Sequence, residues 1–234
     1  MKNLSFMINR LIAHRGYHNK KYQEDTLEAF LKAIYHNYTI ELDIHLLKDN
    51  NIVVYHDNNL KRLNNIDKPI KDYSYKELEK ITNIHIPLLK EVLDLVDAKV
   101  PIIIDYKYGT KVGELEKESV KLLDNYKGEF AIQSFNPLTI LWFRLNRPTY
   151  IRGQIVSNKF PKNYLIRHIL NSMYTNIITN PDYIAVNLSM LKDRKIQKLR
   201  KKYIIIGYTI KNNKELYKYK NLADNFICDI RKES

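Results

Sequence analysis

The chain has 234 residues, and its 39 Lys and Arg against 26 Asp and Glu give a formal net charge of +13. This length suits one domain, residues 1–234, with a sizeable core. The basic residues are scattered along the chain, so a nucleic-acid partner is not expected. The single cysteine, Cys228, excludes an internal disulfide and lies in an apolar run typical of a buried strand. No apolar stretch approaches the ~20 residues that span a bilayer, and the first residues lack a signal-peptide pattern. We therefore expect a cytoplasmic protein without stable membrane insertion.

Apolar strand candidates alternate with helical stretches along the chain, the pattern of a parallel barrel or a doubly wound sheet. Their number, eight, favours a TIM (β/α)8 barrel over an open sheet. The candidates are Arg10–Ala13, Tyr38–Asp43, Val100–Asp105, Phe130–Ser134, Tyr150–Val156, Tyr183–Val186, Tyr203–Thr209 and Asn225–Cys228.

The first helix is predicted to start at Asp25 or Thr26, both good N-cap residues. It should end near Asn37, which tolerates a left-handed conformation at a helix end. The segment 44–99 after the second strand is too long for a single crossover, so we expect a small insertion there. Its expected elements are a strand at Asn51–Tyr55, a polar loop that reaches Asp72, and helices that begin near Ser74 and Leu88.

Polar groups with complementary chemistry follow three of the apolar runs. His14 and His56 could give and take protons near neutral pH. Glu41 and Asp43, two residues apart on one strand, project to the same side and could hold a hard metal ion. Arg15, beside His14, suits a phosphate oxygen. Together these residues predict metal-assisted acid–base cleavage of a phosphate ester.

The stretch from Leu11 to Leu63 resembles the opening of a glycerophosphodiester phosphodiesterase. That family's signature runs His-Arg-Gly, a Glu-Asn-Thr turn into a helix, Glu-x-Asp, and then His-Asp. The turn here reads Glu24-Asp25-Thr26, with Asp in place of the usual Asn. Four motifs in one order make this resemblance specific.

Later parts of the chain continue the resemblance more sparsely. Asp105-Tyr106-Lys107 stands where the family has Glu-x-Lys, and Gln133-Ser134-Phe135 resembles its Ser-Phe end of strand four. Tyr208 stands where the family usually has Trp, and Asp229 ends a match to strand eight. The chain continues for five residues beyond Asp229, so we expect a truncated eighth helix.

The resemblance implies a role for each motif residue. His14 and His56 would be the acid–base pair, and Asp105 would be the third metal ligand beside Glu41 and Asp43. Because Asp is shorter than the family's usual Glu by about 1.5 Å, it would bind through water or draw the ion deeper. Three carboxylates without a nearby Cys favour one divalent cation, Mg²⁺ or Ca²⁺, over Zn²⁺, and the choice between the two stays open.

Other site residues would contact the substrate or support those that do. Arg15 and Lys107 would clamp the phosphate, while Tyr208 and Phe135 would form an apolar wall for the glycerol carbons. The supporting residues are Gly16, which allows a tight turn, and Glu24, which would brace Arg15 or join the metal shell.

The remaining candidate features have ordinary structural interpretations. We expect a hydrogen-bonded structural role for His45, and surface or packing roles for His18, His36, His85 and His168. An apolar stripe is expected to cover the barrel rather than touch a membrane; its residues are Leu165, Ile166, Ile169, Leu170, Met173 and Ile177.

The function that the resemblance implies is hydrolysis of a small glycerophosphodiester to glycerol 3-phosphate and an alcohol. Water could attack directly, or the neighbouring glycerol hydroxyl could first form a cyclic phosphate. One alternative is a phospholipase D-like activity on lysolipids. Another is a non-catalytic barrel that binds phosphate-bearing or nucleic-acid ligands. The sequence indicates no oligomeric state.

Overall fold

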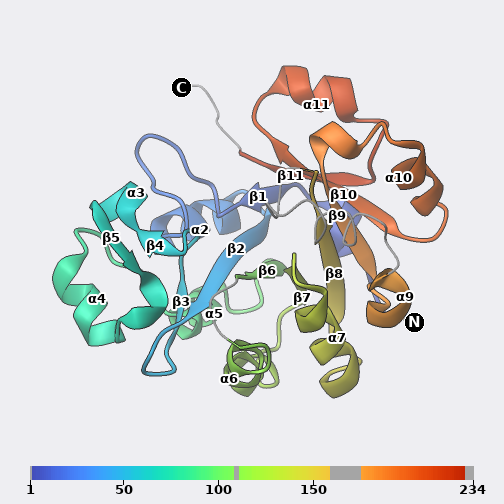
Figure 1. The fold of residues 1–234 in the computed structure, drawn as a ribbon. Helices are drawn as coiled ribbons and strands as arrows, with labels where there is room; N and C mark the ends of the chain where they lie inside the picture. The colour runs from blue at the N-terminus through green and yellow to red at the C-terminus, as the bar shows by residue number, and fades with distance from the viewer. Residues whose placement is uncertain (1, 108–110, 159–174, 230–234) are drawn as a thin grey trace.

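The computed structural model describes residues 2–107, 111–158 and 175–229. Its centre is a closed barrel of eight parallel strands, in which each strand pairs with the next and β1 pairs with both β2 and β11 (Figure 1). The predicted TIM barrel is thus confirmed. The strands are β1 Ile12–His14, β2 Thr39–Leu46, β6 Ile102–Tyr106, β7 Phe130–Ser134, β8 Ile151–Val156, β9 Tyr183–Asn187, β10 Ile204–Ile210 and β11 Asn225–Cys228.

Each barrel strand overlaps one of the eight predicted strands, and the main difference in bounds is at β2. This strand continues to Leu46 because its second half also pairs with β3 (Ile52–Val54) in antiparallel register. At the other end of the sequence, Cys228 is buried in β11 as expected.

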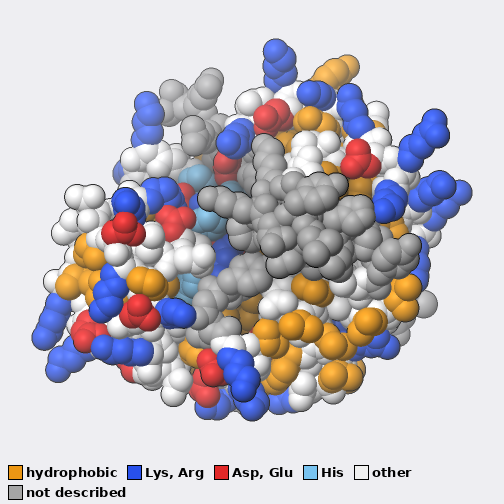
Figure 2. All heavy atoms as spheres, in the orientation of Figure 1, with side chains coloured by type: hydrophobic (Ala, Val, Ile, Leu, Met, Phe, Trp, Pro, Cys, Tyr) orange, Lys and Arg blue, Asp and Glu red, His pale blue; other side chains and the backbone are white. Residues whose placement is uncertain are grey.

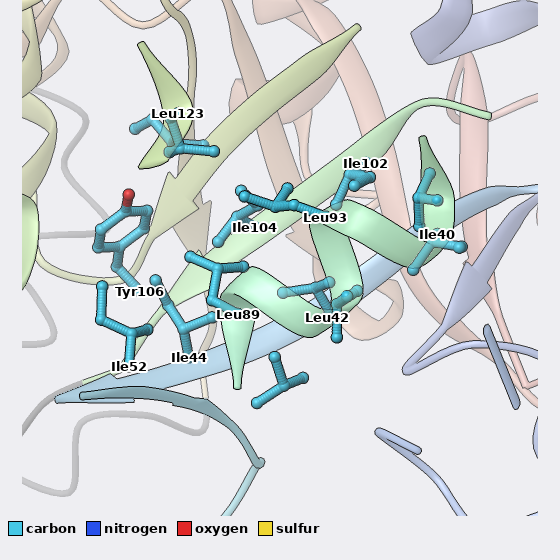
Figure 3. Packing of buried hydrophobic residues seen from close by; sticks show 14 of the residues in the cluster. Ile40, Leu42, Ile44, Ile52, Leu89, Leu93, Ile102, Ile104, Tyr106 and Leu123 are labelled. Atoms are coloured by element: carbon cyan, nitrogen blue, oxygen red, sulfur yellow. The ribbon is translucent and has the colours of Figure 1, made fainter. Parts of the chain in front are cut away.

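Alternation along β2 and β6 separates an apolar outer face from a polar inner one. The outward residues of both strands pack under α5 (Leu89–Val96), as Figure 3 shows, and each fully buried Ile or Leu contributes roughly 1.5–3 kcal/mol. The outward set is Ile40, Leu42, Ile44, Ile102, Ile104 and Tyr106. Because side chains alternate along a strand, this packing turns Glu41, Asp43 and Asp105 toward the barrel interior.

The interior is filled with apolar side chains at the amino ends of the strands. Ile12, Ile103, Tyr183 and Ile206 form this layer with Phe6, which belongs to the short helix α1 (Phe6–Asn9). The polar residues lie beyond it, toward the carboxyl ends.

Helices cover the outside of the barrel. The first, α2 (Leu27–Tyr35), begins after Thr26, whose hydroxyl accepts a hydrogen bond from the Ala29 backbone, and Asn37 adopts the expected left-handed conformation. The other outer helices are α6 Glu114–Leu123, α7 Pro137–Asn146, α9 Thr175–Thr179, η2 Leu188–Met190, α10 Arg194–Leu199 and α11 Asn213–Tyr219.

The insertion between β2 and β6 has a small core of its own. Helices α4 (Tyr75–Ile81) and α5 begin after Ser74 and Leu88, as predicted. The predicted polar loop up to Asp72 is wrong, because Leu60 and Ile70 are buried in this core and anchor short elements. Those elements are β4 Asn59–Leu60, α3 Lys61–Asn64, β5 Ile66–Pro69 and η1 Ile70–Asp72.

Two expectations fall wholly or partly outside the described residues. The truncated eighth helix would occupy residues 230–234, and most of the apolar stripe lies within 159–174. Of that stripe, Ile177 is described, and its side chain is exposed. None of the helices in the described residues is long and apolar enough to span a membrane.

Candidate active site

A cavity of about 200 Å³ opens at the carboxyl ends of the barrel strands. Figure 2 shows histidine side chains, in pale blue, at the surface of the molecule. Lys and Arg side chains, in dark blue, are spread over the same face. The cavity lining includes most of the predicted site residues. It comprises His14, Arg15, Glu41, Asp43, His56, Asp105, Lys107, Gln133, Phe135, Ile155, Tyr208, Thr209 and Ile227.

Three buried carboxyl groups form an acidic centre at the bottom of this cavity. Glu41 and Asp43 come from β2 and Asp105 from β6, and one oxygen of each lies within 4.8 Å of the others. The β2–β6 register places Asp43 directly beside Asp105. Burial raises the pKa of Asp105 to about 6, opposed by Lys107 and reinforced by Asp43. The pKa of Glu41 is also raised, by burial and by the two neighbouring acids.

Two cationic side chains contact the acidic centre. The Nζ atom of Lys107 lies 2.7 Å from Oδ1 of Asp43 and 2.6 Å from Oδ2 of Asp105, and Nε of Arg15 lies 3.1 Å from Oδ2 of Asp43. Burial alone would raise the pKa of Asp43, but Lys107, His56 and Arg15 outweigh it and hold that pKa below its ordinary value. Asp43 is therefore ionised at neutral pH.

The donor set of the acidic centre fits a divalent cation. Three carboxylates supply only hard oxygen atoms, which Mg²⁺ and Ca²⁺ prefer. In the part of the chain that the structure describes, Oδ1 of Asp105 is buried without a hydrogen-bond partner. Burying an ionised carboxylate oxygen without a hydrogen bond costs free energy unless a cation contacts it.

Each predicted catalytic histidine is held by an aspartate. Nδ1 of His14 lies 2.6 Å from Oδ1 of Asp229, and Nδ1 of His56 lies 2.6 Å from Oδ1 of Asp57. Burial opposes ionisation of both aspartates, but hydrogen bonds outweigh it and keep each pKa below its ordinary value. Asp229 accepts from His14 and His18, and Asp57 accepts from Arg62 and then His56. An ionised carboxylate can only accept a hydrogen bond, so Nδ1 of each ring carries the proton. The Nε2 atom of each ring is left for proton exchange.

Burial also keeps both imidazoles neutral. It lowers the pKa of His14 despite the hydrogen bond to Asp229, and it lowers the pKa of His56 to about 4 despite the charge of Asp43. A neutral imidazole with a protonated Nδ1 presents a basic Nε2, which is the form a general base requires.

The loop after β1 positions Arg15. Its backbone N–H donates to Glu41, and its guanidinium donates to Oε1 of Glu24 at 2.7 Å. Glu24 also contacts Arg62, so it braces Arg15 and lies outside the three-carboxylate cluster. Gly16 has φ +78°, and a Cβ there would lie 2.9 Å from the ring of Phe30, so the turn requires glycine.

The two predicted wall residues meet edge to face. The ring centroids of Phe135 and Tyr208 are 6.4 Å apart with an interplanar angle of 87°. The Tyr208 hydroxyl donates to the backbone oxygen of Val156, so the ring is fixed by its polar end. This arrangement gives the cavity a small aromatic side.

The other histidines can be compared with the structural, surface or packing roles expected for them. His45 is buried beside the backbone oxygen of His56, and His36 stacks on Tyr17, as expected for structural residues. The expectation for His18 is wrong, because its Nε2 lies 3.3 Å from the same Asp229 oxygen that contacts His14. His85 is partly exposed beside Glu91, and His168 lies outside the described residues.

Sequence reasoning missed several residues of this site. Asp229 matches the end of strand eight in the family pattern, and Asp57 completes the His-Asp motif after His56, but the sequence alone indicates no role for either. Gln133 reaches Glu41, with Nε2 3.4 Å from Oε1, and Tyr183 donates to Gln133 in turn. The signal for Asp229 was its place directly after the last strand, next to β1 in a closed barrel.

Comparison with known proteins decides the family. The model of the glycerophosphoryl diester phosphodiesterase family matches residues 14–227. The chain belongs to this family. The predicted resemblance is confirmed, and with it the expected membership of an enzyme family.

Similar proteins carry related names. A glycerophosphodiester phosphodiesterase of Bacillus altitudinis is 39% identical over 100 residues, which are 38% of this chain and 40% of that protein. A lysophospholipase D of Rattus norvegicus is 34% identical over 139 residues, 52% of this chain and 43% of that protein. Each alignment thus spans less than half of the relative. The crystal structure of a glycerophosphodiester phosphodiesterase from Thermotoga maritima superposes with a TM-score of 0.76 at 28% identity, over 94% of this chain and 93% of that one.

Proposed function

We propose that this protein hydrolyses soluble glycerophosphodiesters to glycerol 3-phosphate and an alcohol, with one divalent cation and two histidines. The observation that carries the proposal is the convergence of two chemistries on one cavity. The three-carboxylate centre lies at its bottom, and two aspartate-held histidines line it. Family membership supports the proposed substrate class.

The chain's own groups account for the steps of the reaction. A phosphodiester resists attack because its oxygens are anionic and its leaving alkoxide is poor. A cation held by Glu41, Asp43 and Asp105 would withdraw charge from a phosphoryl oxygen. Arg15 and Lys107 would orient the anionic phosphate, since both are charged and face the same cavity.

Proton transfer would fall to His14 and His56. Nε2 of one neutral ring would take a proton from the attacking oxygen. The other ring would first bind a proton from solvent at Nε2 and then give it to the leaving alkoxide, while the first ring would return its proton to solvent. The attacking oxygen is that of water or of the neighbouring glycerol hydroxyl, and the same base serves both. Asp229 and Asp57 stabilise the imidazolium form that appears in turn.

A second candidate function is cleavage of lysolipids. The similarity to a lysophospholipase D of Rattus norvegicus favours it. The size of the cavity, about 200 Å³, favours a small soluble substrate over an acyl chain. A cytoplasmic location and action as one domain, residues 1–234, belong to the same proposal.

The test is an assay of the purified chain on glycerophosphocholine before and after treatment with EDTA. We expect activity to be lost on chelation and restored by Mg²⁺ or Ca²⁺. Glu41→Gln should stay inactive after metal is returned. Full turnover in metal-free protein would refute the metal site, and cleavage of lysophosphatidylcholine alone would favour the lysolipid function.

A further inference from the structure

Asp25 is a buried acid that the mechanism above does not use. It lies in the turn before α2, its exposed fraction is 3%, and its backbone N–H donates to the backbone oxygen of Arg15 at 3.0 Å. Within the described residues, neither oxygen of its carboxyl group has a hydrogen-bond partner. A carboxyl group buried in this way is costly, so its presence requires a physical reason.

Backbone conformation does not supply that reason. Asp25 has φ 55°, in the left-handed region that both Asp and Asn tolerate. Asn would suit the turn equally well, and it would carry no charge into the interior. What distinguishes Asp from Asn at this position is therefore the charge.

Asp25 is linked to the acidic centre through Arg15. Its backbone N–H donates to the backbone oxygen of Arg15, the backbone N–H of Arg15 donates to Oε2 of Glu41 at 3.2 Å, and Nε of Arg15 lies 3.1 Å from Oδ2 of Asp43. Burial raises the pKa of Asp25 well above the ordinary value, and the charges that act on it most are those of Asp43, Arg15 and Glu41, in that order. In turn, burial lowers the pKa of Arg15, but Asp43 and then Asp25 raise it again. Asp25 does not belong to the three acids whose oxygens lie within 4.8 Å of one another, so it is not counted among the candidate ligands.

The balance of charge at this centre is negative when its acids are ionised, the state that a bound cation favours. Four buried carboxyl groups, those of Asp25, Glu41, Asp43 and Asp105, are opposed by the two cations that contact the cluster, Arg15 and Lys107. Two negative charges remain when all four acids are ionised. That is the charge which one divalent cation neutralises.

We propose that Asp25 is an outer carboxyl group of the metal centre, which raises the affinity for a divalent cation through its charge without being a ligand. The proposal rests on the proposed metal site. It predicts that Asp25 destabilises the metal-free protein and strengthens binding of the cation. A residue that merely shapes the turn would do neither.

The experiment is calorimetric titration of metal-free wild type, Asp25→Asn and two controls with CaCl₂ and MgCl₂ at pH 7.5. Asp25→Asn should raise the dissociation constant at least roughly fivefold, because a nearby charge is lost in a poorly solvated site. Asp97→Asn is the matched control, since Asp97 is also left-handed but its side chain is 75% exposed at the end of α5. Its affinity should equal that of wild type. Glu41→Gln should abolish the binding heat and so assign it to the acidic centre.

Thermal unfolding supplies a second readout. Without metal, Asp25→Asn should melt at or above the wild-type temperature, and saturating Ca²⁺ should stabilise it less than it stabilises wild type. Wild-type affinity in Asp25→Asn would overturn the proposal and leave the metal site intact. Absence of any binding heat in wild type would instead refute the metal site itself, and the role of Asp25 with it.

Discussion

Nδ1 of His14 lies 2.6 Å from Oδ1 of Asp229, although 215 positions separate the two residues in the chain. The pairing of β1 with β11 creates this contact, with Ala13 beside Cys228. Asp229 fixes the orientation of the imidazole and the nitrogen that carries its proton. The contact thus makes Asp229 a positioning residue for the proposed acid–base step.

We predict that Asp229→Asn lowers kcat roughly 10- to 1,000-fold, since misorientation removes part of the contribution of a general acid–base group. KM for glycerophosphocholine should change little, because Asp229 is not expected to touch the substrate. Asp224→Asn is the control, because Asp224 directly precedes β11 as Asp229 directly follows it, and it is paired with Arg200 at the opposite end of the strand. Equal kcat in Asp229→Asn and wild type would exclude the positioning role.

The histidines and the phosphate clamp should differ in their kinetic signature. His14→Ala and His56→Ala should each lower kcat roughly 10²- to 10⁴-fold if each transfers a proton. Arg15→Ala should also raise KM, because the phosphate is anionic before the transition state is reached. Steady-state kinetics on glycerophosphocholine separate the two effects. Wild-type turnover in both histidine variants would show that the acid–base assignment is wrong.

Stability should depend on pH through His45. Burial lowers the pKa of His45 from 6.5 to about 4, so below pH 6.5 the unfolded chain binds a proton that the folded chain does not. The free energy of unfolding therefore falls as the pH falls from 6.5 toward 4, by at most about 2 kcal/mol between pH 6.5 and 5. His45→Gln, which cannot titrate, should lose less over this range.

Urea unfolding of wild type and His45→Gln at pH 7 and pH 5, both in EDTA, measures this difference. His36→Gln is a useful comparison, since His36 stacks on Tyr17 at the surface rather than lying within the barrel. Parallel losses of stability in wild type and His45→Gln would contradict the prediction.

Substrate selection should depend on the aromatic wall. Because Tyr208 is smaller than the Trp usual in the family, we expect glycerophosphocholine, glycerophosphoethanolamine and glycerophosphoglycerol to be cleaved with similar kcat/KM. Tyr208→Trp should make the enzyme discriminate among these three substrates, because the larger ring fills part of the cavity that Phe135 borders. Assays of the three substrates, with diacyl phospholipid vesicles as a fourth, test this. Preferred cleavage of vesicles would contradict a small soluble substrate.

The sequence predicts well what depends on local periodicity. Ile40, Leu42 and Ile44 alternate with Glu41 and Asp43, so the two faces of β2 can be read directly from the chain. The acidic centre was predictable for the same reason, once Asp105 was placed at the end of a neighbouring strand. Register and burial in the barrel follow from this pattern.

What escaped prediction depends on contacts between distant elements. The bridge from Lys107 to Asp43 requires β2 and β6 to be neighbours, and the contact of His18 with Asp229 requires the barrel to be closed. The short elements that follow β3 in the insertion, such as β4 with two residues, escaped prediction because no period can show over so few positions. That the Asp25 carboxyl group has no hydrogen-bond partner within residues 2–107, 111–158 and 175–229 can be recognised only when its surroundings are known.

Closure of the barrel at β1 has a consequence for synthesis. Strand β1 pairs with β11, which is made much later, and His14 meets Asp229 only across that junction. A chain still emerging from the ribosome could bury its early strands and bind a cation at β2 and β6, yet it would lack a properly held His14. Full catalytic competence would then begin only when β11 docks against β1, so turnover of a phosphodiester would report that this junction of the barrel has formed.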